Sequence, residues 1–377
     1  MEVVFWLSAF LVAYVYLGYP LLAWALARII GAPVKAGPAQ PAVTVLTAAY
    51  NEADHIEATV RNKLEQDYPP ELLDVIVVSD ESSDGTDELV SALGPRVRLL
   101  RQSPRQGKTA ALNLAVASAA GDVLVFADAN SMYAPDAISQ LVKNFADPRV
   151  GYVTGKMVYV NEDGSLLGDG CSAYMKYENW LRASESRLAS VIGVDGGVDA
   201  VRKALFLPMR ADQQPDFVLP LSVAERGARV VYEPRALLRE SALNEHDAEY
   251  RMRVRVSLRA LWALWDKRRL LNPLRQPLLT FQIFSHKVLR YLAFIPLCAA
   301  LVSSWWLAPS SMLMALAAVA QTAVYLLAFT GWKLHAGNHG AIVGFPYYFA
   351  LLNVASAHAV CKFLGGERQA TWAPRTG

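Results

Sequence analysis

Residues 123–130 read Val-Leu-Val-Phe-Ala-Asp-Ala-Asn, an apolar run that ends in an acidic and an amide side chain. An unbroken apolar run bounded by polar residues predicts a buried strand over 123–127. Asp128 and Asn130 then follow its carboxyl end. Their oxygen atoms suit Mg²⁺ or Mn²⁺, which usually bind one or two carboxylates together with substrate phosphates. The alternative is a strand-end turn in which both side chains bond locally.

Three similar apolar runs precede this one and alternate with helical patterns. Strands that alternate with helices predict a Rossmann-like α/β fold with a mostly parallel sheet and right-handed crossovers. At the first of these helices, Asp54 is expected at the N-cap, with Glu57 completing a capping box. The expected elements are strands over 43–47, 75–79 and 97–100, and helices that begin at Asp54, at Asp84-Gly85-Thr86 and at Lys108.

Polar residues follow the carboxyl ends of these strands, where parallel sheets bind ligands. Asn51 and Glu52 follow the first strand, and Asp80 follows the second. Asp80 can accept hydrogen bonds from a nucleobase or from ribose hydroxyls, and a turn or a helix cap is the alternative for all three. The chain contains neither GxGxxG nor GxxxxGK[ST], which disfavours a dinucleotide oxidoreductase and a P-loop NTPase.

The sequence around two further charged residues, Lys108 and Asp216, suggests roles for them. Lys108 opens a helix after Arg-Gln-Gly, where a cation and backbone amides can hold a diphosphate, although a solvated lysine is the alternative. Asp216 is a lone acid among apolar residues. Partial desolvation would raise the pKa of its carboxyl and suit a general base. The alternative is an N-cap for a helix over 218–226.

A basic amphipathic helix is predicted from residue 251. Arg251, Arg255 and Arg259 form one stripe, and an apolar stripe is formed by Leu258, Leu261, Trp262 and Trp265. Such a helix is typical of the surface of a membrane. One of the arginines can also face a diphosphate leaving group. The two interpretations are compatible.

Composition sets limits on the class of protein. The 377 residues are 54% hydrophobic and 19% charged, against about 45–50% apolar and about 25% charged in an average soluble domain. This disfavours a disordered chain and a wholly soluble protein. The net charge of +2 gives no case for a nucleic-acid partner, and the three cysteines lack the spacing of a zinc site.

Four apolar segments predict transmembrane helices over about 4–27, 290–307, 312–330 and 341–361. A cleavable signal peptide is the alternative for the first, and Glu2 and the length of the run disfavour it. Basic residues at both ends of the middle segment place residues 30–289 in the cytoplasm, beneath the cell (inner) membrane. The basic tail conflicts with a fourth crossing, so a re-entrant segment is the alternative there.

The expected organisation therefore has five parts. They are an anchor at 1–30, a catalytic domain at 40–250, amphipathic interface helices at 251–289, transmembrane helices at 290–361 and a tail at 362–377.

These residues, in this order and between these spans, resemble the family-two inverting glycosyltransferases. The resemblance covers about residues 40–290 and is greatest to membrane-embedded synthases of chitin oligosaccharides, poly-N-acetylglucosamine and cellulose. It implies a GT-A fold, a nucleotide-diphosphate sugar donor (a UDP-sugar), Mg²⁺ or Mn²⁺, and a glycan or lipid-linked acceptor beside the membrane lipid. By motif, it implies donor binding by Asn51, Glu52, Asp80, Lys108, Asp128 and Arg255, metal binding by Asp128 and Asn130, acceptor binding by Gly196 and Gly197, and base catalysis by Asp216.

Two departures from the family pattern matter. Asn130 stands where the DxD motif has its second acid, and the QxxRW motif appears at 252–256 with Arg255 but without glutamine or tryptophan. The second departure puts processive synthesis in doubt. We therefore expect sugar transfer in exopolysaccharide or cell-envelope glycan synthesis. The alternatives are single-sugar transfer to polyprenyl phosphate, a membrane-tethered nucleotidyltransferase and a non-catalytic nucleotide-binding subunit.

Overall fold

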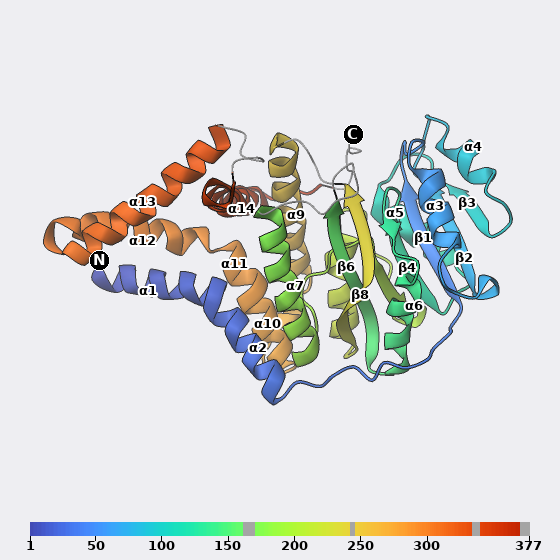
Figure 1. Cartoon of the computed structure of the whole chain (residues 1–377), viewed down its shortest axis with the longest axis horizontal. Helices are drawn as coiled ribbons and strands as arrows, with labels where there is room; N and C mark the ends of the chain where they lie inside the picture. Colours follow the sequence, from blue (N-terminus) through green and yellow to red (C-terminus); the bar gives the residue numbers. More distant parts are fainter. Residues whose placement is uncertain (161–169, 242–245, 334–339, 370–377) are drawn as a thin grey trace.

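The computed structural model describes residues 1–160, 170–241, 246–333 and 340–369. A sheet flanked by helices forms one end of the molecule, and long helices project from the other end (Figure 1). The predicted catalytic domain, C-terminal helical region and tail each include residues outside this description, namely 161–169, 242–245, 334–339 and 370–377.

The first half of the sheet is parallel, as predicted. Its strands lie in the order β3-β2-β1-β4, and every residue of β1 is buried. Ala49 pairs with Ser79 of β2, and Ala48 pairs with Asp128 of β4, so three carboxyl ends meet at one edge. The bounds are β1 (Val43–Ala49), β2 (Leu73–Ser79), β3 (Val97–Arg101) and β4 (Val123–Asp128).

The second half makes the sheet mixed: its β6–β8 pairing is parallel, like the three pairings of the first half, but β4–β7, β6–β7 and β5–β8 are antiparallel. The predicted mostly parallel sheet therefore contains antiparallel pairings that the sequence did not indicate. The eight-stranded order continues β7-β6-β8-β5, with β7 antiparallel to both β4 and β6. A glycine turn at 196–197 leads the chain straight into β7, which therefore runs against β4 instead of crossing over through a helix. The bounds are β5 (Met132–Tyr133), β6 (Val150–Val160), β7 (Asp199–Arg202) and β8 (Arg229–Ser241).

Helices cover both faces of the sheet, and two of their starts differ from the predictions. His55, not Asp54, is the N-cap of α3, and the backbone carbonyl of Glu52 accepts the N–H groups of His55 and Ile56, so no capping box forms. Gln214 is the N-cap of α8, which places Asp216 within the first turn. The bounds are α3 (Ile56–Leu64), η2 (Pro70–Leu72), α4 (Thr86–Ser91), α5 (Lys108–Ser118), α6 (Ala137–Val142), η3 (Lys143–Ala146), η4 (Lys203–Leu205) and α8 (Pro215–Glu225).

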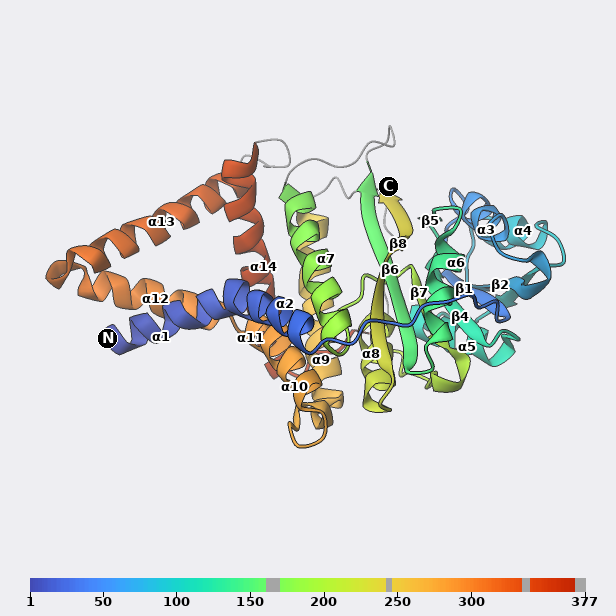
Figure 2. The ribbon, with the colours of Figure 1, turned by 60° about the horizontal axis from the view of Figure 1, so that its bottom comes forward.

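A layer of long helices stands between the sheet and the projecting helices (Figure 2). Buried side chains of α8, α9 and α10 share one apolar core with the sheet. The bounds are α7 (Gly170–Leu188), α9 (His246–Asp266), η5 (Arg268–Leu271), α10 (Pro277–Ile283), η6 (Phe284–Val288), α11 (Leu289–Tyr291) and α14 (Gly340–Leu364).

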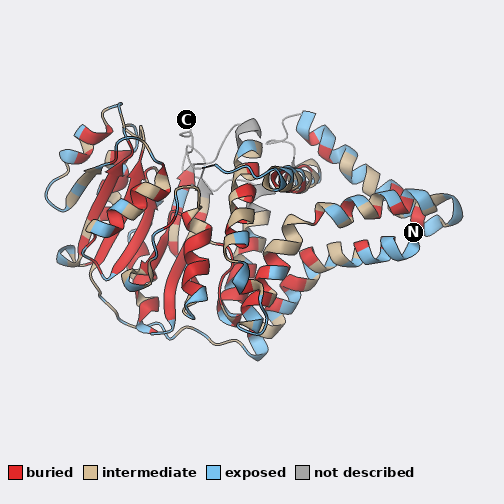
Figure 3. Cartoon of the chain, turned by 180° about the vertical axis from the view of Figure 1, so that it is seen from behind, coloured by how far each residue is buried: buried red, intermediate tan, exposed pale blue. Residues whose placement is uncertain are grey.

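The projecting helices are apolar and largely exposed, in contrast to the buried sheet (Figure 3). Within the described residues, Glu2–Ile29 and Met312–Lys333 are long and apolar enough to cross a membrane. A third crossing is present if Pro277–Tyr291 and Phe294–Ser310, bent by 55°, count as one. The predicted fourth span falls on α14, which is not among these helices. The bounds are α1 (Glu2–Ala13), η1 (Tyr14–Gly18), α2 (Tyr19–Ile29), α12 (Phe294–Leu307), η7 (Ala308–Ser310) and α13 (Met312–Lys333).

Candidate active site

The loop after β1 is fastened to the loop after β2. Asn51 adopts a left-handed backbone (φ 54°), its N–H donates to Ser82 Oγ (3.1 Å), and its Oδ1 accepts from the Ser83 N–H (2.9 Å). The Glu52 N–H donates to Thr86 Oγ1 at 3.0 Å. Asn51 therefore joins the two loops, whereas Glu52 lines the adjacent cavity.

Asp80 lies behind the cavity and does not line it. Its carboxylate is fully buried and accepts hydrogen bonds from the backbone N–H groups of Gln106 and Gly107, both at 2.9 Å, and from the side-chain amide of Gln102 at 2.5 Å. Gly107 directly precedes Lys108. Asp80 thus holds the loop that presents Lys108 to the cavity.

Lys108 and Asp128 form an ion pair between α5 and the end of β4. Their Nζ and Oδ1 atoms are 2.5 Å apart. Burial alone would lower the pKa of Lys108, but the carboxylates of Asp128 and Asp216 raise it above its ordinary value. The lysine therefore stays protonated, which suits binding of an anionic diphosphate.

The glycine turn brings the second acid to the same place. Gly196 and Gly197 both have positive φ, 76° and 72°. A Cβ on Gly196 would lie 2.7 Å from Asp216 Cγ, and one on Gly197 would lie 3.2 Å from Asp128 Oδ2. The hydroxyl of Tyr133 anchors the turn by donating to the Gly197 carbonyl at 2.6 Å. The two acids thus contact the same two-residue turn.

Burial raises the pKa of the Asp216 carboxyl, the charge of Asp128 adds to this, and the charges of Lys108 and Arg259 oppose it. Asp199 on β7 is a neighbouring buried acid that sequence reasoning missed. Burial, together with the charge of Asp216, raises its pKa to about 8. Asp199 is therefore mainly protonated at neutral pH.

The predicted residues meet in a cavity of about 870 Å³. Asn51 and Asp80 do not line it, and Gly196 and Gly197 support the acids that do. The predicted site residues that line it are Glu52, Lys108, Asp128, Asn130, Asp216 and Arg255.

Asp128 and Asn130 fit a divalent cation only together with a ligand that supplies further oxygens. Within the described parts of the chain, no group of three or more His, Cys, Asp or Glu side chains could hold a metal ion. Asp128 and Asn130 both line the cavity, and one carboxylate with one amide suits a cation that completes its coordination with diphosphate oxygens.

Arginines of α9 close another wall of the cavity. Arg259 donates to the Gln213 carbonyl at 2.8 Å, and the Thr109 hydroxyl donates to the same oxygen at 2.7 Å, which fixes the start of α8 beside Asp216. Arg255 lines the cavity and makes no hydrogen bond or ion pair within the part of the chain that the structure describes. Its guanidinium is therefore available to an anionic ligand.

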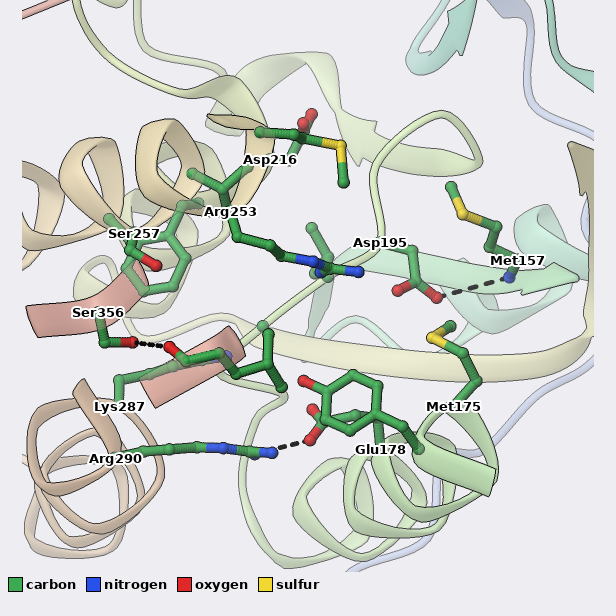
Figure 4. Close-up of a pocket in the computed structure, with 18 of the residues that line it drawn as sticks. Met157, Met175, Glu178, Asp195, Asp216, Arg253, Ser257, Lys287, Arg290 and Ser356 are labelled. Carbon is green, nitrogen blue, oxygen red and sulfur yellow. Dashed lines mark hydrogen bonds and ion pairs between the residues drawn. The ribbon is translucent and has the colours of Figure 1, made fainter. Parts of the chain in front are cut away.

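Sequence reasoning missed a group of ion pairs on the opposite wall (Figure 4). Arg182 pairs with Asp195 at 2.5 Å, and Arg290 pairs with Glu178 at 2.6 Å. Glu178 and Arg182 lie four residues apart on α7, and this spacing of an acid and a base could have indicated a charged face on that helix. Their partners come from elsewhere in the chain, so the pairing itself could not be inferred.

Comparison with known proteins identifies the sheet domain. Residues 44–182 match the family described as Glycosyl transferase family 2. A poly-β-1,6-N-acetyl-D-glucosamine synthase of Staphylococcus aureus is 28% identical over 202 residues, which are 52% of this chain. This chain spans only 48% of that relative's length. An N-acetylglucosaminyltransferase of Sinorhizobium fredii is 26% identical over 373 residues, covering 89% of this chain and 85% of that protein.

A solved structure supports the fold. The structure of the mannosyltransferase PcManGT from Pyrobaculum calidifontis in complex with GDP-Man and Mn²⁺ superposes with a TM-score of 0.72. The superposition covers 97% of this chain and 99% of that chain, at 24% identity. The GT-A-like architecture is therefore confirmed, with the mixed sheet described above. Residues 44–182 form a domain of glycosyltransferase family 2, as the sequence motifs predicted.

Proposed function

We propose that this protein is an inverting glycosyltransferase that moves a sugar from a UDP-sugar to an acceptor hydroxyl in exopolysaccharide or cell-envelope glycan synthesis. The observation that carries the proposal is the contact of Asp128 and Asp216 with one glycine turn at the end of the cavity. The names of the two curated relatives make UDP-N-acetylglucosamine the first donor to test.

The reaction is an in-line displacement at the anomeric carbon of the donor. Asp216 takes the proton of the acceptor hydroxyl while its oxygen forms a bond to that carbon. The bond to the diphosphate breaks, and UDP leaves with the electron pair. Lys108 and Arg255 stabilise the negative charge that develops on the diphosphate. A single displacement inverts the anomeric configuration.

Two further features belong to the proposal. Asp128 and Asn130 would hold Mg²⁺ or Mn²⁺, which supplies additional charge neutralisation at the diphosphate. The exposed apolar helices would lie in the cell membrane, with the sheet domain on the cytoplasmic side, since their length and composition suit crossing a bilayer.

The experiment is the substitution Asp216→Asn in the full chain, purified in detergent. We expect turnover to fall by about 10²–10⁴-fold, the usual contribution of a general base, with little change in donor affinity. UDP release and product formation are measured together. Asp212→Asn, four residues earlier and outside the cavity lining, is the matched control. Turnover of the Asp216 variant within tenfold of wild type would contradict the proposed role.

A further inference from the structure

The cavity does not end at the two acids. Its walls continue past α7 and α9 to the apolar helices, so one void joins the polar sheet edge to the membrane-facing end of the molecule. The residues of η1, α1, α13 and α14 that line this far end are mainly apolar or aromatic. They include Val12, Leu17, Val324, Phe345, Phe349 and Leu352.

The far end opens sideways onto the exposed apolar surface. Leu17, Phe345 and Val324 line the cavity, yet their side chains are 64%, 66% and 40% exposed. A residue that both lines a void and faces outward stands at its mouth. The mouth therefore lies among η1, α13 and α14, the helices that carry the apolar outer surface.

Lys287, a cation without a direct ion pair among the described residues, lines the same cavity, and Glu178 and Glu185 are the acids whose charges act on it. Lys287 Nζ lies against Gly193, in the space that a Cβ there would fill, and 5.8 Å from the ring of Phe217, the neighbour of Asp216. Across the described ranges, Lys287 makes no hydrogen bond or ion pair. The nearby Arg182 and Arg290, in contrast, are each paired with an acid.

We propose that the acceptor is a saccharide linked to a lipid through a phosphate or diphosphate. This inference rests on the proposed function and names its acceptor class. The sugar hydroxyl faces Asp216, the phosphate pairs with Lys287, and the hydrocarbon tail leaves through the mouth among η1, α13 and α14. An ammonium without a direct ion pair in the same cavity as the base, together with an apolar exit, suits an amphiphile that carries a negative charge, whereas a free oligosaccharide would use neither.

The first experiment compares three acceptors with the full chain in detergent and UDP-N-acetylglucosamine as donor. They are N-acetylglucosamine on an undecyl diphosphate, the uncharged undecyl glycoside of the same sugar, and free tri-N-acetylchitotriose. We expect kcat/KM to be highest for the diphosphate lipid, by at least about tenfold over the glycoside. Equal or better use of the free trisaccharide would overturn the inference while leaving the proposed function intact.

Substitutions test the two contacts separately. Lys287→Met should raise KM for the diphosphate lipid at least about tenfold and leave the uncharged glycoside unaffected. Lys333→Met, an exposed lysine outside the lining, is its control. Ala13→Trp should obstruct the mouth and impair both lipids, whereas Leu22→Trp, on the same run of helix but outside the lining, should impair neither. Equal effects of each variant and its control would overturn the inference.

A binding readout separates failure of the inference from failure of the proposed function. A diazirine at the tail end of the undecyl diphosphate probe is photoactivated on the wild-type chain without donor. We expect crosslinks within 12–17 and 345–356, suppressed by excess unlabelled diphosphate lipid and weakened by Lys287→Met. Labelling spread over the outer helices without competition overturns the inference. Specific labelling without transfer from any nucleotide sugar overturns only the proposed function.

Discussion

The two ends of the cavity are built in different ways. Following the proposed function, we call the end with Lys108 and Asp128 the donor end and the end between α7, α9 and the apolar helices the acceptor end. At the donor end, the residues come from segments that follow neighbouring strands, and Asp80 accepts hydrogen bonds from backbone N–H groups. At the acceptor end, the walls are helices from distant parts of the chain. The ion pair of Glu178 and Arg290 joins α7 to α11, and Arg182 of α7 pairs with Asp195 in the loop before β7.

This difference indicates which end is easier to alter. A site whose side chains are set by strand ends keeps its geometry as long as the sheet folds. A site made by helices from the two ends of the chain depends on the packing of those helices. We therefore expect donor-end substitutions to lower turnover with little effect on folding, and acceptor-end substitutions to affect stability.

The largest expected effect is at the donor end. Asp128→Ala should lower turnover by about 10³-fold, equivalent to about 4 kcal/mol, because it removes both the partner of Lys108 and the carboxylate ligand of the proposed cation. Chelation should inactivate the wild type to a similar extent and add nothing in the variant. Asp122→Ala, at the opposite end of β4, should retain activity. Full activity of the wild type in a chelator would exclude the proposed cation.

At the acceptor end we expect a loss of stability. Glu178→Gln leaves the Arg290 guanidinium, whose side chain is only 18% exposed, without its charge partner, which costs about 3 kcal/mol. Thermal unfolding of the full chain in detergent measures this. The exposed pair of Glu57 and Arg61 supplies the control, since Glu57→Gln should cost only about 0.3–0.5 kcal/mol. Similar shifts in the two variants would mean that the acceptor end does not depend on its ion pairs.

The turn at Gly196 and Gly197 allows a sharper test, because another glycine with a positive φ can serve as its control. Gly196→Ala should lower turnover by about 10²-fold, because its Cβ would displace Asp216 and a misplacement of about 1 Å can cost that much. Gly227 also has a positive φ, 83°, but a Cβ there would meet nothing within 4 Å. Gly227→Ala should therefore lose about 1–2 kcal/mol of stability through backbone strain, as Gly196→Ala does, but its turnover should not change. Equal turnover in the two variants would argue against the contact with Asp216.

The smallest expected effect is on the pH dependence of kcat/KM. Asp216 must be deprotonated to accept a proton, so activity is lost as the pH falls through its raised pKa. Lys108 lowers that pKa, and Lys108→Met should therefore move the acidic limb to higher pH. Lys203→Met, outside the cavity lining, should leave the limb in place. A shift of the acidic limb to lower pH in the Lys108 variant would contradict the conclusion that Lys108 lowers the pKa of Asp216.

The parallel half of the fold and most donor-end residues could be predicted because their signals are local. An apolar strand followed by Asp128, and a helix opened by Lys108, are visible within a few residues. The strand direction in the second half was not visible, because β7 is only four residues long and its direction depends on the turn at Gly196. Asp80 was correctly placed at a strand end, but its burial depends on a loop that folds back over it.

The acceptor end was beyond sequence reasoning for a different reason. Lys287 looked like one of several basic residues before a membrane segment, and Val12 looked like part of a uniform apolar run. In the folded chain both line one cavity, although they lie far apart in the sequence. The packing of α14 against α9 was likewise not visible, because an apolar sequence does not reveal its partner helix.

The turn at Gly196 and Gly197 acts as a spacer of fixed width between the two carboxylates. Because backbone, not a flexible side chain, separates Asp128 from Asp216, the gap between the two carboxylates cannot widen without moving β7. Under the proposed function, a variant that accepts bulkier sugars would therefore be reached sooner by substitutions in the surrounding walls than by changes to the spacer.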